Sequence, residues 1–404
     1  MSEQQNIPPL RFSEFSDEWR REPFKTLVKI NQGLQIAISE RLTEKVEGAL
    51  FYITNEFLRE NSEKQFFILN ATESVICTED DVLMTRTGNT GKVVTNVAGA
   101  FHNNFFKIKY PKHIERDFLV NFLNLSQTQS FILRLAGTST IPDLNHSDFY
   151  KINFVYPTLP EQQKIASFLT AVDIKIAQLT KKKTLLEQYK KGVMQKIFSQ
   201  EIRFKIKNEA GELVEPPDWE EKKLKEVCKY YDGTHQTPTY VENGVPFYSV
   251  EHVTADQFVK TKFISKEVFE KENKRVKLEK GDILMTRIGS IGVAKYIDWD
   301  VNASFYVSLA LIKANAKTNP LYLSQFIHST FFQRELWKRT IHVAFPQKIN
   351  LGEIGECIVK MPDLEEQTQI ANFLSAIDDK IKLVSTQLEK TQEFKKGLLQ
   401  QMFV

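Results

Sequence analysis

The feature that most constrains this chain is a long amphipathic stretch at residues 159–198. Apolar residues recur in it at every seventh position, and a second apolar column runs beside the first. The first column consists of Ile165, Val172, Leu179, Leu186 and Val193, and the second of Leu169, Ile176 and Ile197. A sustained seven-residue apolar repeat is typical of a helix that packs in a coiled coil. About 38 residues at roughly 1.5 Å per residue predict a rod of about 57 Å.

A second copy of this stretch lies at residues 364–403. Its columns consist of Ile370, Ile377, Val384, Thr391 and Leu398, and of Leu374, Ile381, Leu388 and Met402. A shift of 205 residues superimposes the two patterns and places Lys190-Lys191-Gly192 on Lys395-Lys396-Gly397. Polar residues interrupt the columns at Lys183, Lys190 and Thr391. We expect these to set the register of the helices or to leave surface for partners.

The rest of the chain repeats together with the helices. The lead-in Leu10-Arg11-Phe12 and Trp19 return after the first helix as Ile202-Arg203-Phe204 and Trp219. Each half therefore holds a lead-in, a mixed globular segment and a long helix. Short β-branched and aromatic runs bounded by turn residues predict that the globular segments are α+β. The predicted division of the chain is 1–156, 157–200, 201–361 and 362–404.

Within the globular segments, strands are expected at Phe66–Leu69, Asp81–Met84, Phe105–Ile108, Val245–Tyr248 and Asp282–Met285. Helical regions are expected near Phe118–Leu125 and Leu321–Thr340. The two segments nearly coincide around Asp81 and Asp282, whereas Phe24–Ser74 and Leu224–Val276 share little. A common scaffold with diverged surfaces is expected when two copies bind different versions of one kind of ligand.

Length and composition exclude several classes of protein. A chain of 404 residues is too long for one ordinary core, and 42% hydrophobic with 26% charged residues indicates a globular chain. The net charge of +3 permits an acidic partner without requiring one. Three scattered cysteines, Cys77, Cys228 and Cys357, argue against a disulfide framework or a zinc site. With no signal-peptide pattern and no apolar run of membrane-spanning length, the sequence predicts a soluble, cytoplasmic protein.

The sharpest pair of local motifs is DVLMTRTGNTGKV at Asp81–Val93 and DILMTRIGSIGVA at Asp282–Ala294. In each motif a strand ending in Thr-Arg leads into a Gly-x-x-Gly turn. Glycines let the backbone approach a phosphate closely, and an arginine can donate to it with two N–H groups. The alternative is a structural strand–turn–strand whose arginine pairs with a local carboxylate. The candidate binding residues are Thr85, Arg86, Gly88, Asn89, Lys92, Thr286, Arg287, Gly289 and Ser290.

A second candidate loop is DGTHQTPTY at Asp232–Tyr240. It offers Thr234, His235 and Gln236, whose side chains can form hydrogen bonds with base edges. The alternative is a surface histidine in a simple turn. Asn31-Gln32-Gly33 occupies the matching place in the first half of the chain.

No catalytic constellation is found in the sequence. The run GNTGK lacks the spacing of a Walker motif, and Val93 replaces the required Ser or Thr. Neither an N-P-P-Y nor a D-P-P-Y run nor a dinucleotide fingerprint occurs, and the histidines show no metal-binding spacing. Pro217-Asp218 and Glu221-Lys222-Lys223 lie too close together for a metal-dependent nuclease site. We expect no metal, no cofactor and no catalysis in this chain. The lysine runs at 181–183 and 190–191 form either a solvated helix face or contacts to phosphate.

Both halves also share the pattern L-x-E-Q-x-x-I-A-x-F-L-x-A-[VI]-D-x-K-I. It occurs at Leu159–Ile176 and Leu364–Ile381, each time shortly after a proline, Pro157 or Pro362. The chain resembles the specificity subunit of a type I restriction–modification system. The resemblance rests on these segments, on the Lys-Lys-Gly helix ends, on the Leu10-Arg11-Phe12 lead-in and on the D-[VI]-L-M-T-R strands. The resemblance covers essentially the whole chain.

The resemblance implies both a fold and a function. The fold is α+β, with two pseudo-repeated mixed α/β target-recognition domains separated by two long helices that form an antiparallel coiled coil. Each domain would bind one half of an asymmetric bipartite site in double-stranded DNA. The helices would hold the domains apart and dock two methyltransferase subunits, which restriction subunits join. S-adenosylmethionine, ATP and Mg²⁺ are expected on those partner subunits, and none of them on this chain.

Two points stay open at this stage. Base-reading residues vary within the family, so the resemblance assigns none of them, and the binding residues named above are our own candidates for contact with DNA. The apolar columns of both helices are the candidate coiled-coil and subunit-docking residues. The alternative function is a non-enzymatic two-domain scaffold on a coiled coil that binds proteins rather than DNA.

Overall fold

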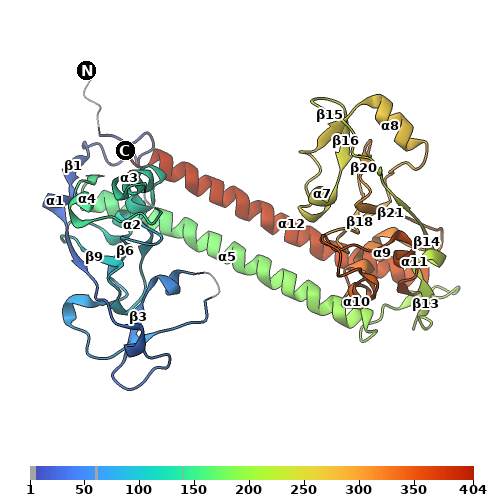
Figure 1. Ribbon diagram of the computed structural model, residues 1–404, viewed down its shortest axis with the longest axis horizontal. Coiled ribbons are helices and arrows are strands. Elements are labelled where there is room, and N and C mark those ends of the chain that lie inside the picture. The colour runs from blue at the N-terminus through green and yellow to red at the C-terminus, as the bar shows by residue number, and fades with distance from the viewer. Residues whose placement is uncertain (1–5, 60–61, 139) are drawn as a thin grey trace. The chain divides into compact units, whose positions relative to one another are not determined.

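The computed structural model describes residues 6–404 except 60, 61 and 139. The chain forms two compact units (Figure 1). Unit 1 comprises Met1–Thr180 and Thr386–Val404, and unit 2 comprises Lys181–Ser385. Each unit contains one globular segment and a part of both long helices, α5 (Leu159–Phe198) and α12 (Leu364–Gln401). The four segments predicted from the sequence repeat divide the chain differently, and their boundaries stay a prediction.

Unit 1 is built from two sheets and a layer of helices. The antiparallel central sheet has the order β2-β9-β6-β7, formed by Lys29–Gln32, Phe105–Lys109, Val82–Thr85 and Val93–Val94. The distal sheet has the order β4-β3-β8-β5, formed by Phe67–Ile68, Leu50–Ile53, Gly99–Phe101 and Ile76–Cys77. The helices are α1 (Phe24–Leu27), α2 (Arg116–Asn124), α3 (Ser126–Ala136) and α4 (His146–Phe149). A ribbon of β1 (Arg20–Pro23) and β10 (Asn153–Tyr156) completes the unit, with single turns of 3-10 helix at Ile38–Glu40, Asn55–Leu58 and Glu73–Val75.

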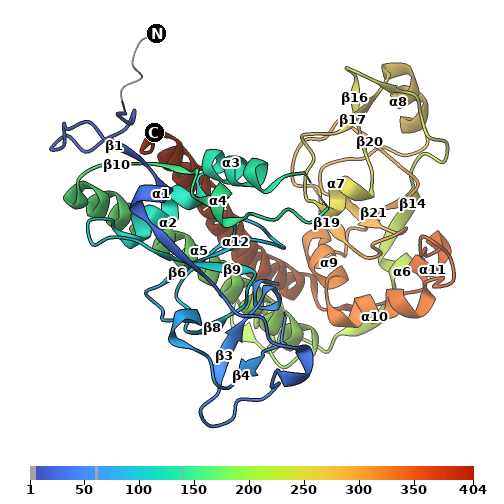
Figure 2. The same cartoon turned by 60° about the vertical axis from the view of Figure 1, so that its left-hand side comes forward.

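Unit 2 repeats this plan. Its central sheet has the order β14-β21-β18-β19, formed by Cys228–Asp232, Leu309–Ala314, Ile283–Thr286 and Ala294–Tyr296. Its distal sheet has the order β15-β17-β16-β20, formed by Tyr240–Val241, Lys262–Ile264, Val245–Tyr248 and Ser304–Phe305. The helices are α6 (Leu224–Val227), α7 (Val250–Thr254), α8 (Lys266–Asn273), α9 (Pro320–Ile327), α10 (Thr330–Arg339) and α11 (Leu351–Gly355). The ribbons are β13 (Glu220–Lys223) with β22 (Ile358–Met361), and β11 (Ile206–Lys207) with β12 (Leu213–Val214). Figure 2 shows α8 with the distal sheet at one end of this unit and α9, α10 and α11 at the other.

The helical region expected near Leu321–Thr340 is divided into two helices. α9 ends at Ile327 and α10 begins at Thr330. The Ser329 hydroxyl accepts a hydrogen bond from the backbone N–H of Phe332 (3.2 Å) and thereby caps α10. Because an N-cap residue has non-helical backbone angles, the chain turns at this serine and α10 starts in a new direction.

The largest core of each unit joins the central sheet, the helical layer and the long helices. In unit 1, Phe403 lies just past the end of α12 and stacks on Phe118 of α2 at 4.9 Å between ring centroids. In unit 2, Phe198 ends α5 and packs edge-to-face on Phe326 of α9 at 5.2 Å. A shift of 205 residues relates Phe198 to Phe403. Each fully buried phenylalanine contributes about 1.5–3 kcal/mol, so these rings tie the helix ends to the domains.

The two long helices run antiparallel within each unit. In unit 1 the start of α5, at Ile165 and Leu169, shares a core with the end of α12, at Leu398. In unit 2 the end of α5, at Val193, shares a core with the start of α12, at Ile370. The predicted coiled-coil residues are buried or half-buried, and the antiparallel coiled coil is confirmed.

Two equivalent ion pairs connect the helices of this pair. In unit 1, Lys395 Nζ lies 2.6 Å from Asp173 Oδ1, and in unit 2, Lys190 Nζ lies 2.6 Å from Asp378 Oδ1. The shift of 205 residues turns one pair into the other. Lys190, which interrupts the apolar column in the sequence, therefore marks a cross-helix contact.

Charge reversal at the unit 2 pair should show whether this contact helps to fix the register. Asp378→Lys places two cations side by side, and we expect it to destabilise unit 2 by about 1 kcal/mol, because the pair is partly exposed to solvent. Adding Lys190→Asp should recover most of the loss. A double-mutant cycle by urea unfolding measures the coupling. Additive effects of the two substitutions would mean that the ion pair contributes nothing to register.

The Glu-Gln pair of the shared motif anchors each lead-in and each domain to a helix start. In unit 2, Glu366 accepts from Arg203 Nε (2.8 Å), Arg203 Nη2 (2.9 Å), Trp219 Nε1 (2.9 Å) and the Phe204 N–H (3.2 Å). Gln367 Nε2 donates to Pro362 O (2.9 Å), and its Oε1 accepts from the Asn319 N–H (2.8 Å). The motif is therefore a hydrogen-bonding device at the junction of lead-in, domain and helix.

Unit 1 builds the same junction. Glu161 accepts from Arg11 Nε and Nη2, both at 2.7 Å, and Gln162 bridges Pro157 O and the Glu115 N–H, both at 2.9 Å. The lead-in also continues the end of a long helix in both units. The Leu10 N–H donates to Gln401 O (2.9 Å), just as the Ile202 N–H donates to Lys196 O (3.1 Å). Lys196 and Gln401 are again 205 residues apart.

Candidate nucleic-acid interface

Three loops meet at one edge of the central sheet of unit 1. The Asn103 N–H donates to Leu34 O (3.0 Å), and the Arg86 N–H donates to Asn104 O (2.7 Å). Gly33 lies so close to the neighbouring turn that a Cβ on it would be 2.1 Å from Phe101 O. Only glycine fits this contact, which explains the glycine of the Asn-Gln-Gly run. We call residues 32–35, 85–92 and 102–104 loop edge 1.

Unit 2 builds the same edge from matching segments. The Val307 N–H donates to Thr234 O (3.0 Å), and the Arg287 N–H donates to Ser308 O (2.9 Å). A Cβ on Gly233 would lie 2.2 Å from Phe305 O, as at Gly33. We call residues 232–236, 286–290 and 306–308 loop edge 2. The structure thus brings the two motifs singled out in the sequence, Thr-Arg-x-Gly and Asp-Gly-Thr-His, together at one place.

Loop edge 1 is rich in amide side chains. Gln32 Nε2 donates to Asn103 O (3.2 Å), and Asn103 Nδ2 donates to the exposed Gln35 Oε1 (2.9 Å). The predicted residues Asn89 and Lys92 of the same loop edge are exposed, and Lys92 Nζ donates to Leu58 O (3.4 Å). Amide side chains can donate to and accept from adenine together, and lysine can contact phosphate. This edge therefore offers both kinds of contact that DNA recognition requires.

Loop edge 2 has different side chains. Asp232 lies 2.6 Å from His235 Nε2 and 2.5 Å from Arg275 Nη1, while Thr237 Oγ1 and the Tyr306 hydroxyl are 2.9 Å apart. Burial alone would raise the pKa of Asp232, but the hydrogen bonds from Arg275 and His235 outweigh it, and the pKa lies below the ordinary value. His235 and Gln236 are exposed, and their contact with DNA stays a prediction. Thr234 is buried, and its hydroxyl donates to Glu272 (3.0 Å).

The two motif arginines have partners inside the protein. Arg86 Nη2 lies 2.6 Å from Asp143 Oδ2. Arg287 donates through Nε to Val307 O (2.8 Å) and through Nη1 to Ile349 O (3.1 Å), and burial lowers its pKa. These geometries favour the structural interpretation of the arginines, in which they brace neighbouring loops. Contact of either arginine with DNA stays a prediction.

The other motif residues stabilise the turns or allow their backbone angles. Thr85 and Thr286 are buried, and their hydroxyls donate to the backbone carbonyls of Asn89 (2.5 Å) and Ser290. Gly88, Asn89 and Gly289 adopt positive φ angles of 61°, 62° and 78°. Such angles favour glycine and asparagine. Ser290 is exposed at the tip of its turn.

The parts of the chain that diverge between the halves contribute strands to both sheets of each unit. Phe24–Ser74 contains β2 of the central sheet and β3 and β4 of the distal sheet. Leu224–Val276 contains β14 of the central sheet and β15, β16 and β17 of the distal sheet, together with α6, α7 and α8. In unit 1, the small cores between the two sheets contain no residue of α5 or α12 among the described residues. In unit 1, the diverging strands β3 and β4 therefore belong to a layer that is not packed on the long helices.

A family model described as the type I restriction modification DNA specificity domain matches residues 18–188 and 216–393. The chain belongs to this family. The type I restriction enzyme MjaVIII specificity subunit of Methanocaldococcus jannaschii is 27% identical over 410 residues, covering 98% of this chain and 94% of that protein. The EcoBI specificity subunit of Escherichia coli is 25% identical over 293 residues, covering 66% of this chain and 61% of that protein.

A crystal structure of the S subunit of the type I restriction–modification system from M. genitalium has the same fold. It matches with a TM-score of 0.65 at 16% identity and covers 98% of this chain and 99% of that chain. The chain is a DNA specificity subunit with two copies of the specificity domain, and the family resemblance is confirmed. The protein-binding scaffold is not supported.

The long helices of the specificity subunit expose apolar side chains on their outer faces. In unit 2, Leu185, Tyr189 and Leu383 are more than half exposed, and in unit 1 the same holds for Ile174 and Phe394. Tyr189 and Phe394 occupy equivalent positions 205 residues apart. Several large apolar side chains on one helix face mark a surface that a partner covers.

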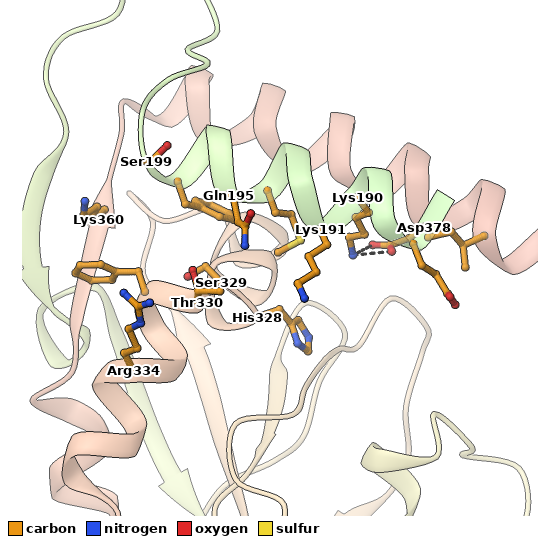
Figure 3. Close-up of a pocket in the computed structure, with 15 residues that line it drawn as sticks. Lys190, Lys191, Gln195, Ser199, His328, Ser329, Thr330, Arg334, Lys360 and Asp378 are labelled. Carbon is orange, nitrogen blue, oxygen red and sulfur yellow. Dashed lines mark hydrogen bonds and ion pairs between the residues drawn. The ribbon is translucent and has the colours of Figure 1, made fainter. Parts of the chain in front are cut away.

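A cavity of about 670 Å³ in unit 2 is lined by the end of α5, the start of α10 and part of α12 (Figure 3). Met194 and Phe198 of α5 and Phe331 of α10 form its apolar part. Lys191, Arg334 and Lys360 also line it, and the ammonium group of Lys360 lies 4.7 Å from the ring centroid of Phe331. Glu187 and Asp378 line it as well, so cationic, acidic and apolar groups meet in this cavity. Shifted by 205 residues, Lys360 falls on Val155 of unit 1, so this charge distinguishes the two units.

The sequence did not point to several residues that the structure places at the loop edges. Gln35, Asn103, Arg275 and Tyr306 belong to segments without a recognisable motif. The one available signal for unit 1 was the density of Asn and Gln at 31–35 and 103–104. Within the described ranges, no group of three or more His, Cys, Asp and Glu side chains is placed to hold a metal ion. No helix in the described part of the chain is long and apolar enough to span a bilayer.

Proposed function

We propose that this specificity subunit recognises an asymmetric bipartite sequence in double-stranded DNA, with one half-site read by each unit. The observation that carries the proposal is the presence of one loop edge in each unit, built on the same backbone but with different side chains. Amides dominate loop edge 1, whereas loop edge 2 exposes His235 and Gln236 and contains the half-buried Tyr306. Two unlike edges select unlike half-sites. Phosphate contacts would set the register, and base edges would give specificity.

The helix pair would set the gap between the half-sites and dock the partner subunits. α5 has 40 residues. At roughly 1.5 Å per residue such a helix is about 60 Å long, which exceeds one DNA turn of roughly 34 Å. The exposed apolar residues of α5 and α12 support docking of two methyltransferase subunits, which restriction subunits join. S-adenosylmethionine, ATP and Mg²⁺ would bind to those partners, and this chain would direct adenine methylation or cleavage without catalysing either.

Mapping of methylated adenines tests this function. The chain is co-expressed with its cognate modification subunit, and methylated adenines are located across the host genome. We expect one bipartite motif with a constant gap, present only when both proteins are expressed. Methylation without a shared motif, or no methylation by an assembled complex, would contradict the proposal.

Single-edge variants show which unit reads which half. Gln35→Ala removes an exposed amide of loop edge 1, and His235→Ala removes an exposed imidazole of loop edge 2. A bidentate contact to a base contributes about 1–3 kcal/mol of discrimination, so loss of one should relax a single position. Each variant is the control for the other. Relaxation of both halves by one variant would argue against separate readers.

A further inference from the structure

A loop of unit 2 presents large apolar side chains to solvent. It runs from Ile341 to Ile349, between α10 and α11. Val343 is 96% exposed and Phe345 is fully exposed. Trp337, at the end of α10, is 67% exposed, and its ring lies 4.9 Å from that of His342. Apolar groups gathered in this way mark an interaction surface.

The exposed side chains stand on a braced loop. The Ile341 N–H donates to Lys348 O (2.8 Å) and closes the loop. The Gly289 N–H donates to Gln347 O (2.8 Å), and Arg287 Nη1 donates to Ile349 O (3.1 Å). Both donors belong to loop edge 2, so the loop is a direct continuation of this edge.

The charge of the loop suits an acidic partner. The run from Thr340 to Asn350 contains no acidic residue, and Lys348 is exposed. Gln347, beside it, is also exposed and can reach a base edge or a phosphate. An apolar tip flanked by a cation and hydrogen-bonding groups is the arrangement by which proteins place apolar side chains in a DNA groove.

We propose that the loop Ile341–Ile349 enters a groove of the bound DNA, with Val343 and Phe345 against the bases of the half-site read by unit 2. This inference rests on the proposed DNA recognition and adds the surface that carries it out. It also assigns a role to the arginine of the D-I-L-M-T-R strand. Arg287 is a positioning residue, because it holds the base of the loop through Ile349 O and the neighbouring turn through Val307 O.

The corresponding loop of unit 1 has different side chains and a different arginine contact. Isolated β-bridges place Asp143 beside Thr87, as they place Lys348 beside Ile288. The unit 1 loop carries Ile141, which is 64% exposed, and Arg86 binds the carboxylate of Asp143 instead of a backbone carbonyl. The Phe345 contact therefore belongs to one half-site, and its loss should affect that half alone.

Anisotropy with the purified complex tests the proposal. The full chain, bound to its cognate modification subunit, is titrated onto a labelled duplex that carries the mapped bipartite motif. We expect the Val343→Ala, Phe345→Ala double variant to raise the dissociation constant about tenfold or more, as for a buried aromatic contact. The slope of log K against log salt should stay unchanged, because no phosphate contact is lost. Lys348→Ala should instead lower that slope by about one.

Controls separate the loop from the rest of the protein. Leu213→Ala removes an exposed leucine from the β11–β12 ribbon of the same unit and should leave the affinity unchanged. Circular dichroism and gel filtration confirm folding and assembly of each variant. Wild-type affinity of the double variant would overturn the loop inference alone. If the double variant fails to bind the modification subunit in the absence of DNA, the inference is also overturned, because the loop would then be a protein-docking surface. Absence of motif-dependent binding by the wild-type complex would overturn the proposed function as well.

Discussion

Glu366→Ala is expected to destabilise unit 2 by about 3–5 kcal/mol, because it leaves a buried charge without its partner. The Glu366 carboxylate is fully buried and satisfies the Arg203 guanidinium, the Trp219 indole N–H and the Phe204 amide at once. Without this carboxylate, Arg203 keeps the backbone contact to Pro217 O (2.6 Å), a long contact to Gln200 (3.5 Å) and its position over the Trp219 ring (5.5 Å), and loses its ion-pair partner. Urea unfolding of the full chain measures the loss.

The equivalent substitution in unit 1 is the matched control. Glu161 accepts only from Arg11, and Trp19 Nε1 has no hydrogen-bond partner in the part of the chain that the structure describes. Glu161→Ala therefore removes fewer hydrogen bonds, and we expect a smaller loss of stability than for Glu366→Ala. Equal losses would mean that the indole contact contributes nothing, and a loss below about 1 kcal/mol at Glu366 would contradict the anchoring role of the motif.

The second large effect is expected from Ile176→Pro in α5. A proline within a helix removes one backbone hydrogen bond and clashes with the preceding turn, at a cost of about 3 kcal/mol or more. Ile176 packs against the main core of unit 1, which also contains the end of α12. The break should therefore separate the two helices locally, and the complex should fail to assemble with its modification subunit. Gel filtration of the co-expressed proteins measures assembly.

Ile176→Val keeps the helix and most of the apolar contact, and it should assemble normally. Assembly of the proline variant at wild-type yield would show that the helix pair is not the docking element. Assembly without DNA methylation would instead show that docking survives and that the helix is needed only to place the domains.

The long helices could be predicted closely from the sequence. The structure places α5 at Leu159–Phe198, the range over which the seven-residue pattern persists. β6, at Val82–Thr85, and β9, at Phe105–Lys109, also agree with the expected strands. Such elements are predictable because a buried face requires apolar residues at the period of the element, and that period is visible in the sequence.

The division of the α9–α10 region was not predicted in detail. The pattern from Leu321 to Thr340 stays helical on both sides of the break, and one capping contact of Ser329 decides where the chain turns. A serine can cap a helix or face solvent within one, and the choice depends on packing around it.

The role of the motif arginines also depended on the fold. Both Thr-Arg-x-Gly motifs allowed a phosphate contact or a local partner. The structure supplies Asp143 for Arg86 and two backbone carbonyls for Arg287, at sequence separations of 57, 20 and 62 residues. No local pattern reveals partners so distant in the sequence.

The sequence by itself determined the duplication, the length of the helices and the two motifs that the loop edges share. These features are repeated or periodic, so they can be recognised in a single sequence before any tertiary contact is known. Tertiary structure alone decided the pairing of Lys190 with Asp378, the assembly of three loops into each edge and the exposure of Phe345. The physical reason is that these properties depend on which distant segments meet. The residue type alone does not determine whether a side chain is buried or exposed.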